Sequence, residues 1–116
     1  MVTSAFRLVA WSLMLFVTFS CHSSYQYQAT AKPQAIPTFH SIGLYYSPRD
    51  ASEDKICHVS FKILNEAKWR SGLDLWFDPK SNEYRGSLVN LYPGVTYEIK
   101  FTLEKTNRSR NIKVTT

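Results

Sequence analysis

The sequence predicts an all-β fold in which six to seven short antiparallel strands form the two layers of a sandwich. Apolar and polar side chains alternate along residues 97–103, as in a strand with one buried face. Several other short segments alternate in the same way, and clusters of turn-forming residues separate them. No helical period occurs after residue 22. Together these three observations are typical of an antiparallel sandwich.

The turn at Pro93 and Gly94 is expected to reverse the chain between two strands. Proline pre-sets the first turn angle, and glycine accepts a positive φ. Tyr97 opens the strand that follows. A tyrosine in this place is typical of the tyrosine corner of immunoglobulin-like sandwiches, in which its hydroxyl bonds backward to the backbone. The stretch therefore favours an immunoglobulin-like antiparallel sandwich.

Two earlier segments have the same period of two. In residues 39–47, Ile42, Leu44 and Tyr46 share one face, and a polar turn cluster follows. In residues 56–63 the inward positions are Cys57, Val59, Phe61 and Ile63. Cys57 is therefore expected to be a small buried hydrophobe with a free thiol. An immunoglobulin-type disulfide is excluded, because the strand that begins at Tyr97 has no cysteine.

The later segments are shorter. Residues 65–72 are polar with one tryptophan, and form a connection or a short irregular strand. Residues 73–78 alternate again, with Leu73, Leu75 and Phe77 expected inward and Asp74, Trp76 and Asp78 expected outward. Before these segments, Pro33 and Pro37 bracket a short extended lead-in that could serve as an edge strand. The remaining expected elements are a turn at 79–82, a segment at 84–91 leading to the Pro93 turn, a hairpin loop at 105–111 and a last strand at 112–115.

The amino-terminal residues 1–21 have the three parts of an export signal. Arg7 is followed by an apolar run over residues 8–19 and then by small residues. This run is shorter than the roughly 20 residues that a membrane-spanning helix needs. Cleavage before Cys21 by ordinary signal peptidase predicts a soluble exported protein. The residues before Cys21 also resemble a loose lipobox, which predicts a lipid anchor on that cysteine.

The predicted organisation is a signal peptide at 1–21, a flexible tether at 22–35 and a sandwich at 36–116. The expected location is extracellular or in the cell envelope, with the membrane reached only through a lipid on Cys21. Without Arg7, 13 Lys and Arg stand against 9 Asp and Glu, which gives a net charge of +4. These charges are scattered, without the dense basic stripe or reading motif of a nucleic-acid-binding surface, so nucleic acid is not an expected partner.

The sequence predicts neither an enzyme nor a cofactor or metal site. His22, His40 and His58 lack metal-ligand spacing. Cys57 and His58 are adjacent in a strand, so they point to opposite faces and do not form a nucleophile–base pair. The carboxylates show no pairing suited to acid–base catalysis.

Trp76 is the strongest candidate for a ligand-binding residue. An exposed tryptophan beside Asp74 and Asp78 could stack on a sugar ring while the carboxylates bond its hydroxyls. Other aromatic residues that could contribute are Trp69, Tyr45, Tyr84 and Tyr92. The competing interpretation is that these aromatic side chains cover the sheet or pack on a neighbouring domain.

Two motifs carry a family resemblance, residues 69–78 (WRSGLDLWFD) and residues 84–97 (YRGSLVNLYPGVTY). The second resembles the fibronectin type III pattern in which a Leu, a Pro-Gly turn, a Thr and a Tyr join two strands. With residues 41–46 they resemble the fibronectin type III-like amino-terminal domain of exported bacterial proteins that usually continue into a right-handed parallel β-helix of the polysaccharide-lyase kind. A looser similarity is to the non-catalytic sandwich that precedes the catalytic domain of purple acid phosphatases.

This resemblance covers residues 36–116, and Tyr46 stands where fibronectin type III domains often bury a tryptophan. It implies a non-catalytic accessory, spacer or binding module that presents a sandwich surface to a neighbouring domain, a protein or a polysaccharide. The alternative is the leading part of a larger β-helix enzyme that degrades polysaccharides, whose catalytic domain lies outside these 116 residues.

Overall fold

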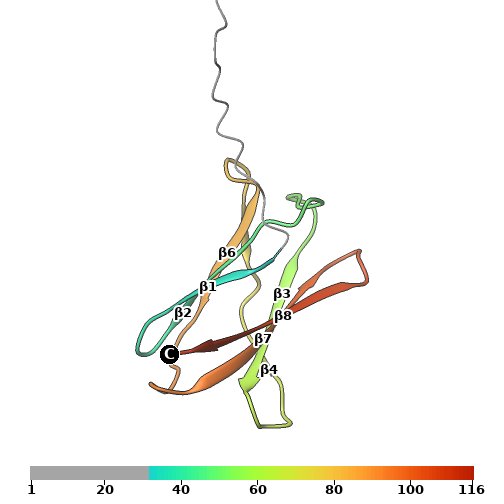
Figure 1. Ribbon diagram of the computed structural model, residues 1–116. Coiled ribbons are helices and arrows are strands. Elements are labelled where there is room, and N and C mark those ends of the chain that lie inside the picture. The colour runs from blue at the N-terminus through green and yellow to red at the C-terminus, as the bar shows by residue number, and fades with distance from the viewer. Residues whose placement is uncertain (1–31) are drawn as a thin grey trace, which may run out of the picture.

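A computed structural model describes residues 32–116, which form eight strands and no helix (Figure 1). The predicted signal peptide, Cys21 and most of the predicted tether lie outside the described residues. The strands are β1 (Gln34–Pro37), β2 (Ile42–Tyr46), β3 (Cys57–Ile63), β4 (Arg70–Ser71), β5 (Trp76–Asp78), β6 (Glu83–Leu88), β7 (Thr96–Leu103) and β8 (Arg108–Thr115).

The strands form two four-stranded sheets, in the orders β1-β2-β6-β5 and β4-β3-β7-β8. All strand pairs within the two sheets are antiparallel. The predicted all-β antiparallel fold is therefore confirmed for residues 32–116, and the two sheets are compatible with a sandwich. The count exceeds the expected six to seven because β4 and β5 are separate strands of only two and three residues.

The core lies between the sheets and follows the predicted alternation. In β7 every second residue is buried, from Tyr97 to Leu103, because one face of this central strand packs inward. In β2 the buried positions are Ile42, Leu44 and Tyr46, as expected. The inward face of β3 is confirmed at Cys57 and Val59, whereas Phe61 and Ile63 are only half-buried near the strand end.

The first strand confirms the edge strand expected between Pro33 and Pro37, since β1 is an outer strand of its sheet. It begins at Gln34, two residues before the expected start of the domain at Ile36, because Gln34 pairs with Tyr45 and Ala35 with Leu44. The last hairpin loop is shorter than expected. Since β7 and β8 pair as far as Leu103 and Arg108, the loop is confined to residues 104–107.

The segment from Gly72 to Trp76 crosses from one sheet to the other, and this overturns part of the predicted pattern. The Gly72 and Leu75 amides still donate to β3 carbonyls, while Trp76 already pairs with Arg85 in β6. Leu75 is therefore buried, but Leu73, which was expected in the core, is 82% exposed. A strict period of two holds only while a segment stays in one sheet, so it fails here.

The crossing is packed tightly against β6. A Cβ atom on Gly86 would lie 2.5 Å from Cδ2 of Leu75, so only glycine leaves room for that side chain in its present position. The crossing segment therefore reaches the second sheet directly above Gly86. This contact fixes the position at which the chain leaves the crossing segment and enters the edge strand β5 at Trp76.

Candidate ligand-binding surface

Trp76 projects from the edge strand β5 and is 66% exposed. Its neighbours Leu75 and Phe77 point to the inner side, where Leu75 is buried and Phe77 is half-buried. A hollow of about 250 Å³ lies beside the indole, lined by Glu53, Lys55, Ile56, Leu75, Trp76 and Phe77. Trp76 is thus an exposed aromatic ring beside a mixed apolar and charged hollow, an arrangement suited to binding a ligand with an apolar face.

Arg85 lies directly opposite Trp76 in the sheet and is held by a polar cluster. Its Nε donates to Glu83 Oε1 at 2.8 Å, and its Nη2 donates to Ser81 Oγ at 3.0 Å. The same Nη2 lies 3.3 Å from Asp78 Oδ2. The hydrogen bond to Glu83 and the charge of Asp78 raise the pKa of Arg85. The guanidinium is therefore permanently charged and fixed in one orientation.

Asp78 was expected to face solvent beside Trp76, and this expectation is wrong. Asp78 is only 9% exposed, because Arg85 and the turn after β5 cover its carboxylate. The Lys80 amide donates to Asp78 Oδ1 at 3.0 Å. Burial opposes ionisation, but the hydrogen bonds from Ser81 and the Lys80 amide, together with the Arg85 charge, outweigh it and lower the pKa of Asp78. Asp78 therefore positions Arg85 and is not available to bond a ligand hydroxyl directly.

Tyr84 was also a candidate for the surface, and it lies in the core with no exposed area. Its hydroxyl donates to the Ser52 carbonyl at 2.8 Å and accepts from the Ser52 amide at 3.2 Å. Its ring packs against Phe77 with centroids 5.1 Å apart. Tyr84 thus anchors the connection between β2 and β3, and it is excluded from the binding surface.

Asp74 is exposed as predicted, but it faces a histidine rather than Trp76. Its Oδ1 lies 2.7 Å from Nδ1 of His58, and the two side chains are 52% and 47% exposed. This pair could not be predicted from the sequence, because the residues are 16 positions apart and meet only through the crossing segment. Such a solvated pair contributes little to stability.

Trp69 does not join the Trp76 surface, because it lies beside the other sheet, just before β4. Lys100 Nζ lies 4.4 Å from the centroid of the Trp69 ring, and Lys62 Nζ lies 5.1 Å from it. Lys62 also pairs with Glu98 at 3.6 Å. The half-buried indole therefore covers two lysines of a polar sheet face through cation–π contacts.

Tyr97 is 2% exposed, and its hydroxyl accepts a hydrogen bond from the Tyr92 amide at 2.9 Å. Gly94 has a φ of 69°, in the left-handed region that glycine tolerates. The Gly94 amide donates to the carbonyl of Thr116 at 3.1 Å. The Pro93-Gly94 turn and Tyr97 therefore join the β6–β7 connection to the end of β8.

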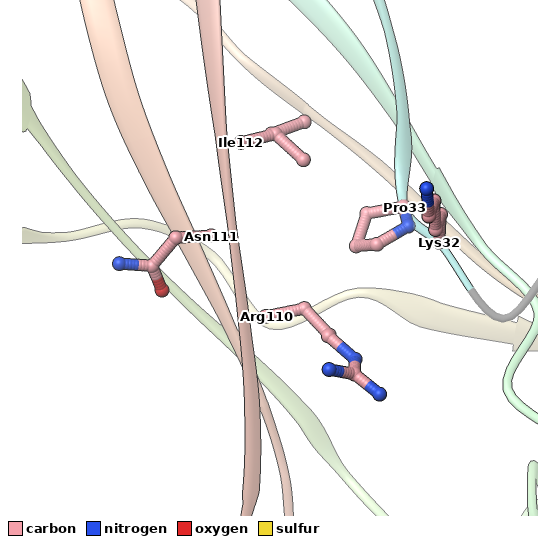
Figure 2. A pocket seen from close by; sticks show the side chains of 5 residues that line it. All are labelled: Lys32, Pro33, Arg110, Asn111 and Ile112. Atoms are coloured by element: carbon pink, nitrogen blue, oxygen red, sulfur yellow. The ribbon is translucent and has the colours of Figure 1, made fainter.

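A cavity of about 460 Å³ lies between β8 and the residues that precede β1 (Figure 2). Arg110 and Ile112 project from β8 on the side of Pro33 and Lys32, whereas Asn111 points to the opposite side of the strand. β1 and β5 are the two outer strands of their sheet, so this cavity is distant from Trp76. It has no aromatic ring among its lining residues and is not part of the Trp76 surface.

Cys57 is a free cysteine, as expected, and it is buried with no exposed area. His58 points outward from the next position, so the two side chains lie on opposite faces of β3. Residues 32–116 contain no group of three or more His, Cys, Asp or Glu side chains that could hold a metal ion. Among the same residues, no helix is long and apolar enough to cross a membrane.

Cys57 makes the stability of the domain sensitive to alkaline pH. Burial, with a smaller contribution from the Asp74 charge, raises the pKa of its thiol to about 12 from 9.0. Between these values the unfolded chain releases the proton while the folded chain keeps it, so the free energy of unfolding falls as pH rises, by roughly 1.4 kcal/mol per pH unit. Urea unfolding between about pH 8 and pH 9.5 measures the onset of this fall, where unfolded tyrosines, with an ordinary pKa near 10, are still mostly protonated.

The matched control is Cys57→Ala, which lacks the thiol. Its free energy of unfolding is expected to be lower at neutral pH, because a buried side chain is truncated, but to fall less steeply above about pH 9. Equal slopes for the two proteins would show that Cys57 is not protected from ionisation.

A scan against models of protein families found no match to this chain. A search of curated proteins found no significantly similar sequence.

Proposed function

We propose that the chain is a non-catalytic binding module of an exported protein, a fibronectin type III-like sandwich that presents the Trp76 surface to a polysaccharide or protein partner. The order β1-β2-β6-β5 corresponds to the A-B-E-D sheet of immunoglobulin-like domains, and β3-β7-β8 corresponds to their C-F-G sheet. The bond from the Tyr92 amide to the Tyr97 hydroxyl is consistent with a tyrosine corner. Both features support the immunoglobulin-like part of the proposal.

The observation that carries the binding role is the 66% exposure of Trp76 beside its hollow. A large aromatic side chain on an edge strand loses stabilising burial, so its exposure is accounted for if a partner covers it. The exposed Trp76 ring is compatible with a sugar or with an apolar protein group.

Tryptophan fluorescence tests this role. The full chain is titrated with a soluble galactomannan and with polygalacturonate, and the same titrations are made on Trp69→Phe and Trp76→Phe. A change in emission is expected for the wild type and Trp69→Phe, and not for Trp76→Phe. No change in any protein at millimolar sugar concentrations would eliminate polysaccharide as the partner.

We propose that the chain is exported. It is then either released as a soluble protein that begins at Cys21 or anchored by a lipid on that residue. Mass spectrometry of the mature amino terminus separates them. A lipid mass on an amino-terminal Cys21 supports anchoring, and an unmodified or absent Cys21 rejects it.

A second candidate function is the leading domain of a larger β-helix enzyme that degrades polysaccharides. It is favoured by Phe39, which is 79% exposed and lines a cavity of about 330 Å³ together with Thr116. Tyr92 is 64% exposed and its carbonyl accepts a hydrogen bond from the Thr116 hydroxyl at 2.6 Å. A following domain would contact these two rings. An in-frame β-helix sequence in the DNA after codon 116 would support this function, and its absence would reject it.

A further inference from the structure

Three side chains form a row across the outer face of the β1-β2-β6-β5 sheet. The strand register places Tyr45 opposite Arg85, and Arg85 opposite Trp76. All three point away from the core, because their chain neighbours Leu44, Tyr84 and Leu75 are buried. Tyr45 and Trp76 are two strand spacings apart, which is about 9–10 Å.

The Tyr45 ring occupies the space beside Gly43, which has no side chain of its own. A Cβ atom on Gly43 would lie 3.5 Å from Cε2 and 3.7 Å from the hydroxyl of Tyr45, so the ring lies over Gly43 along its own strand. Tyr45 is half-buried as a result, with one side against the backbone and the other toward solvent. A ring that already rests on the sheet loses little conformational freedom when a ligand stacks on it.

Arg85 is equally fixed between the two rings, through its bonds to Glu83, Ser81 and Asp78. Its Nη1 group makes none of these bonds, and the side chain is 43% exposed. The Cα atoms of the three residues therefore lie in one line across the strands. The row consists of an aromatic ring, a hydrogen-bond donor and a second aromatic ring, with the Tyr45 ring set back along β2 over Gly43. Ser87, exposed on the same face, adds a hydroxyl next to this line.

We propose that this row binds a single unbranched chain of a neutral β-1,4-linked polysaccharide, laid across the strands. In an extended chain of this kind the orientation of the sugar ring repeats at every second residue. Equivalent rings are therefore one disaccharide unit apart. That repeat is close to the backbone separation of Tyr45 and Trp76, about 9–10 Å. One ring stacks on Tyr45, the ring after next stacks on Trp76, and the intervening sugar accepts a hydrogen bond from Arg85 Nη1.

The charges of the row favour a neutral chain over a polyuronate. Arg85 is the only cation in the row, and Glu83 and Asp78 lie directly behind it. The three groups together carry a net charge of −1, so an anionic sugar gains no net attraction from them. A neutral sugar still receives the hydrogen bond, because the Nη1 group of this partly exposed side chain needs only an oxygen acceptor.

This inference rests on the proposed binding function and adds the ligand class and the second ring. Isothermal titration of the full chain with cellobiose, cellotetraose and tetragalacturonate tests it. Cellotetraose can reach both rings, whereas cellobiose can reach only one. Cellotetraose is therefore expected to bind about tenfold or more tightly than cellobiose.

Two variants and one control locate the site. Tyr45→Ala is expected to abolish the advantage of cellotetraose, and Trp76→Ala to weaken binding of both sugars about tenfold. Trp69→Ala removes an aromatic ring from the other sheet and should change neither affinity. All three side chains lie outside the core, and a circular-dichroism spectrum unchanged from wild type verifies that each variant is folded.

The outcomes distinguish failure of this inference from failure of the proposed binding function. If the wild type binds sugar but Tyr45→Ala keeps the length dependence, or if tetragalacturonate binds more tightly than cellotetraose, the inference is wrong while the proposed binding function stands. If the folded wild type binds none of the three sugars, both the inference and polysaccharide recognition by this domain are rejected.

Discussion

Replacing Phe101 with alanine is expected to lower the free energy of unfolding by about 3–5 kcal/mol. Phe101 has no exposed area and lies in the middle of β7, the strand between β3 and β8. Its ring packs against Tyr46 of the opposite sheet, with centroids 5.7 Å apart. The truncation therefore removes a contact between the two layers and leaves a cavity that the surrounding strands cannot fill.

Urea unfolding followed by circular dichroism measures this loss. Phe39→Ala is the matched control, because Phe39 is 79% exposed and its truncation should change the unfolding free energy by less than about 0.5 kcal/mol. A small domain has little stability to spare, so Phe101→Ala is expected to be partly unfolded at 37 °C. Similar losses for the two variants would contradict a core between the sheets at this position.

Replacing Tyr97 with phenylalanine is expected to cost about 1–3 kcal/mol, although only one oxygen atom is removed. The hydroxyl of Tyr97 accepts the Tyr92 amide inside the β6–β7 connection. Phenylalanine keeps the ring and its packing near Phe61, where the centroids are 6.3 Å apart, but leaves that amide without its acceptor. An unpaired backbone donor in a part-buried site is costly because water replaces the lost partner only incompletely.

Tyr92→Phe provides the comparison for the same chemical change on an exposed residue. Tyr92 is 64% exposed, so this variant should match the wild type within about 0.5 kcal/mol. Hydrogen exchange of the Tyr92 amide gives a second measurement, and exchange should be faster in Tyr97→Phe. Unchanged exchange would show that the hydroxyl does not hold the connection.

The faces of β2, β3 and β7 could be predicted from sequence because each strand stays within one sheet and buries one side. The alternation then follows directly from the pleat. It failed at Leu73, because the segment from Gly72 to Leu75 remains bonded to β3 while crossing toward β6. The position of a sheet crossing depends on pairing between distant strands, which a local period does not contain.

The candidate surface was only partly predictable for the same reason. Exposure of Trp76 followed from its place between inward neighbours, but burial of Asp78 depends on a pairing with Glu83 that brings Arg85 over it. Tyr84 could have been assigned to the core, since Tyr84 and Leu88 lie four residues apart on one face of a strand. The row formed with Tyr45 needed the register of three strands, which only the structure supplies.

The most direct test of the proposed surface is two-dimensional NMR of the ¹⁵N-labelled chain during addition of cellotetraose. The Trp76 indole N–H and the backbone amides of β2, β5 and β6 are expected to shift together, while the Trp69 indole, on the other sheet, stays in place. Shifts centred on Trp69, or on β3 and β7, would contradict the assignment of ligand binding to the face that carries Tyr45, Arg85 and Trp76.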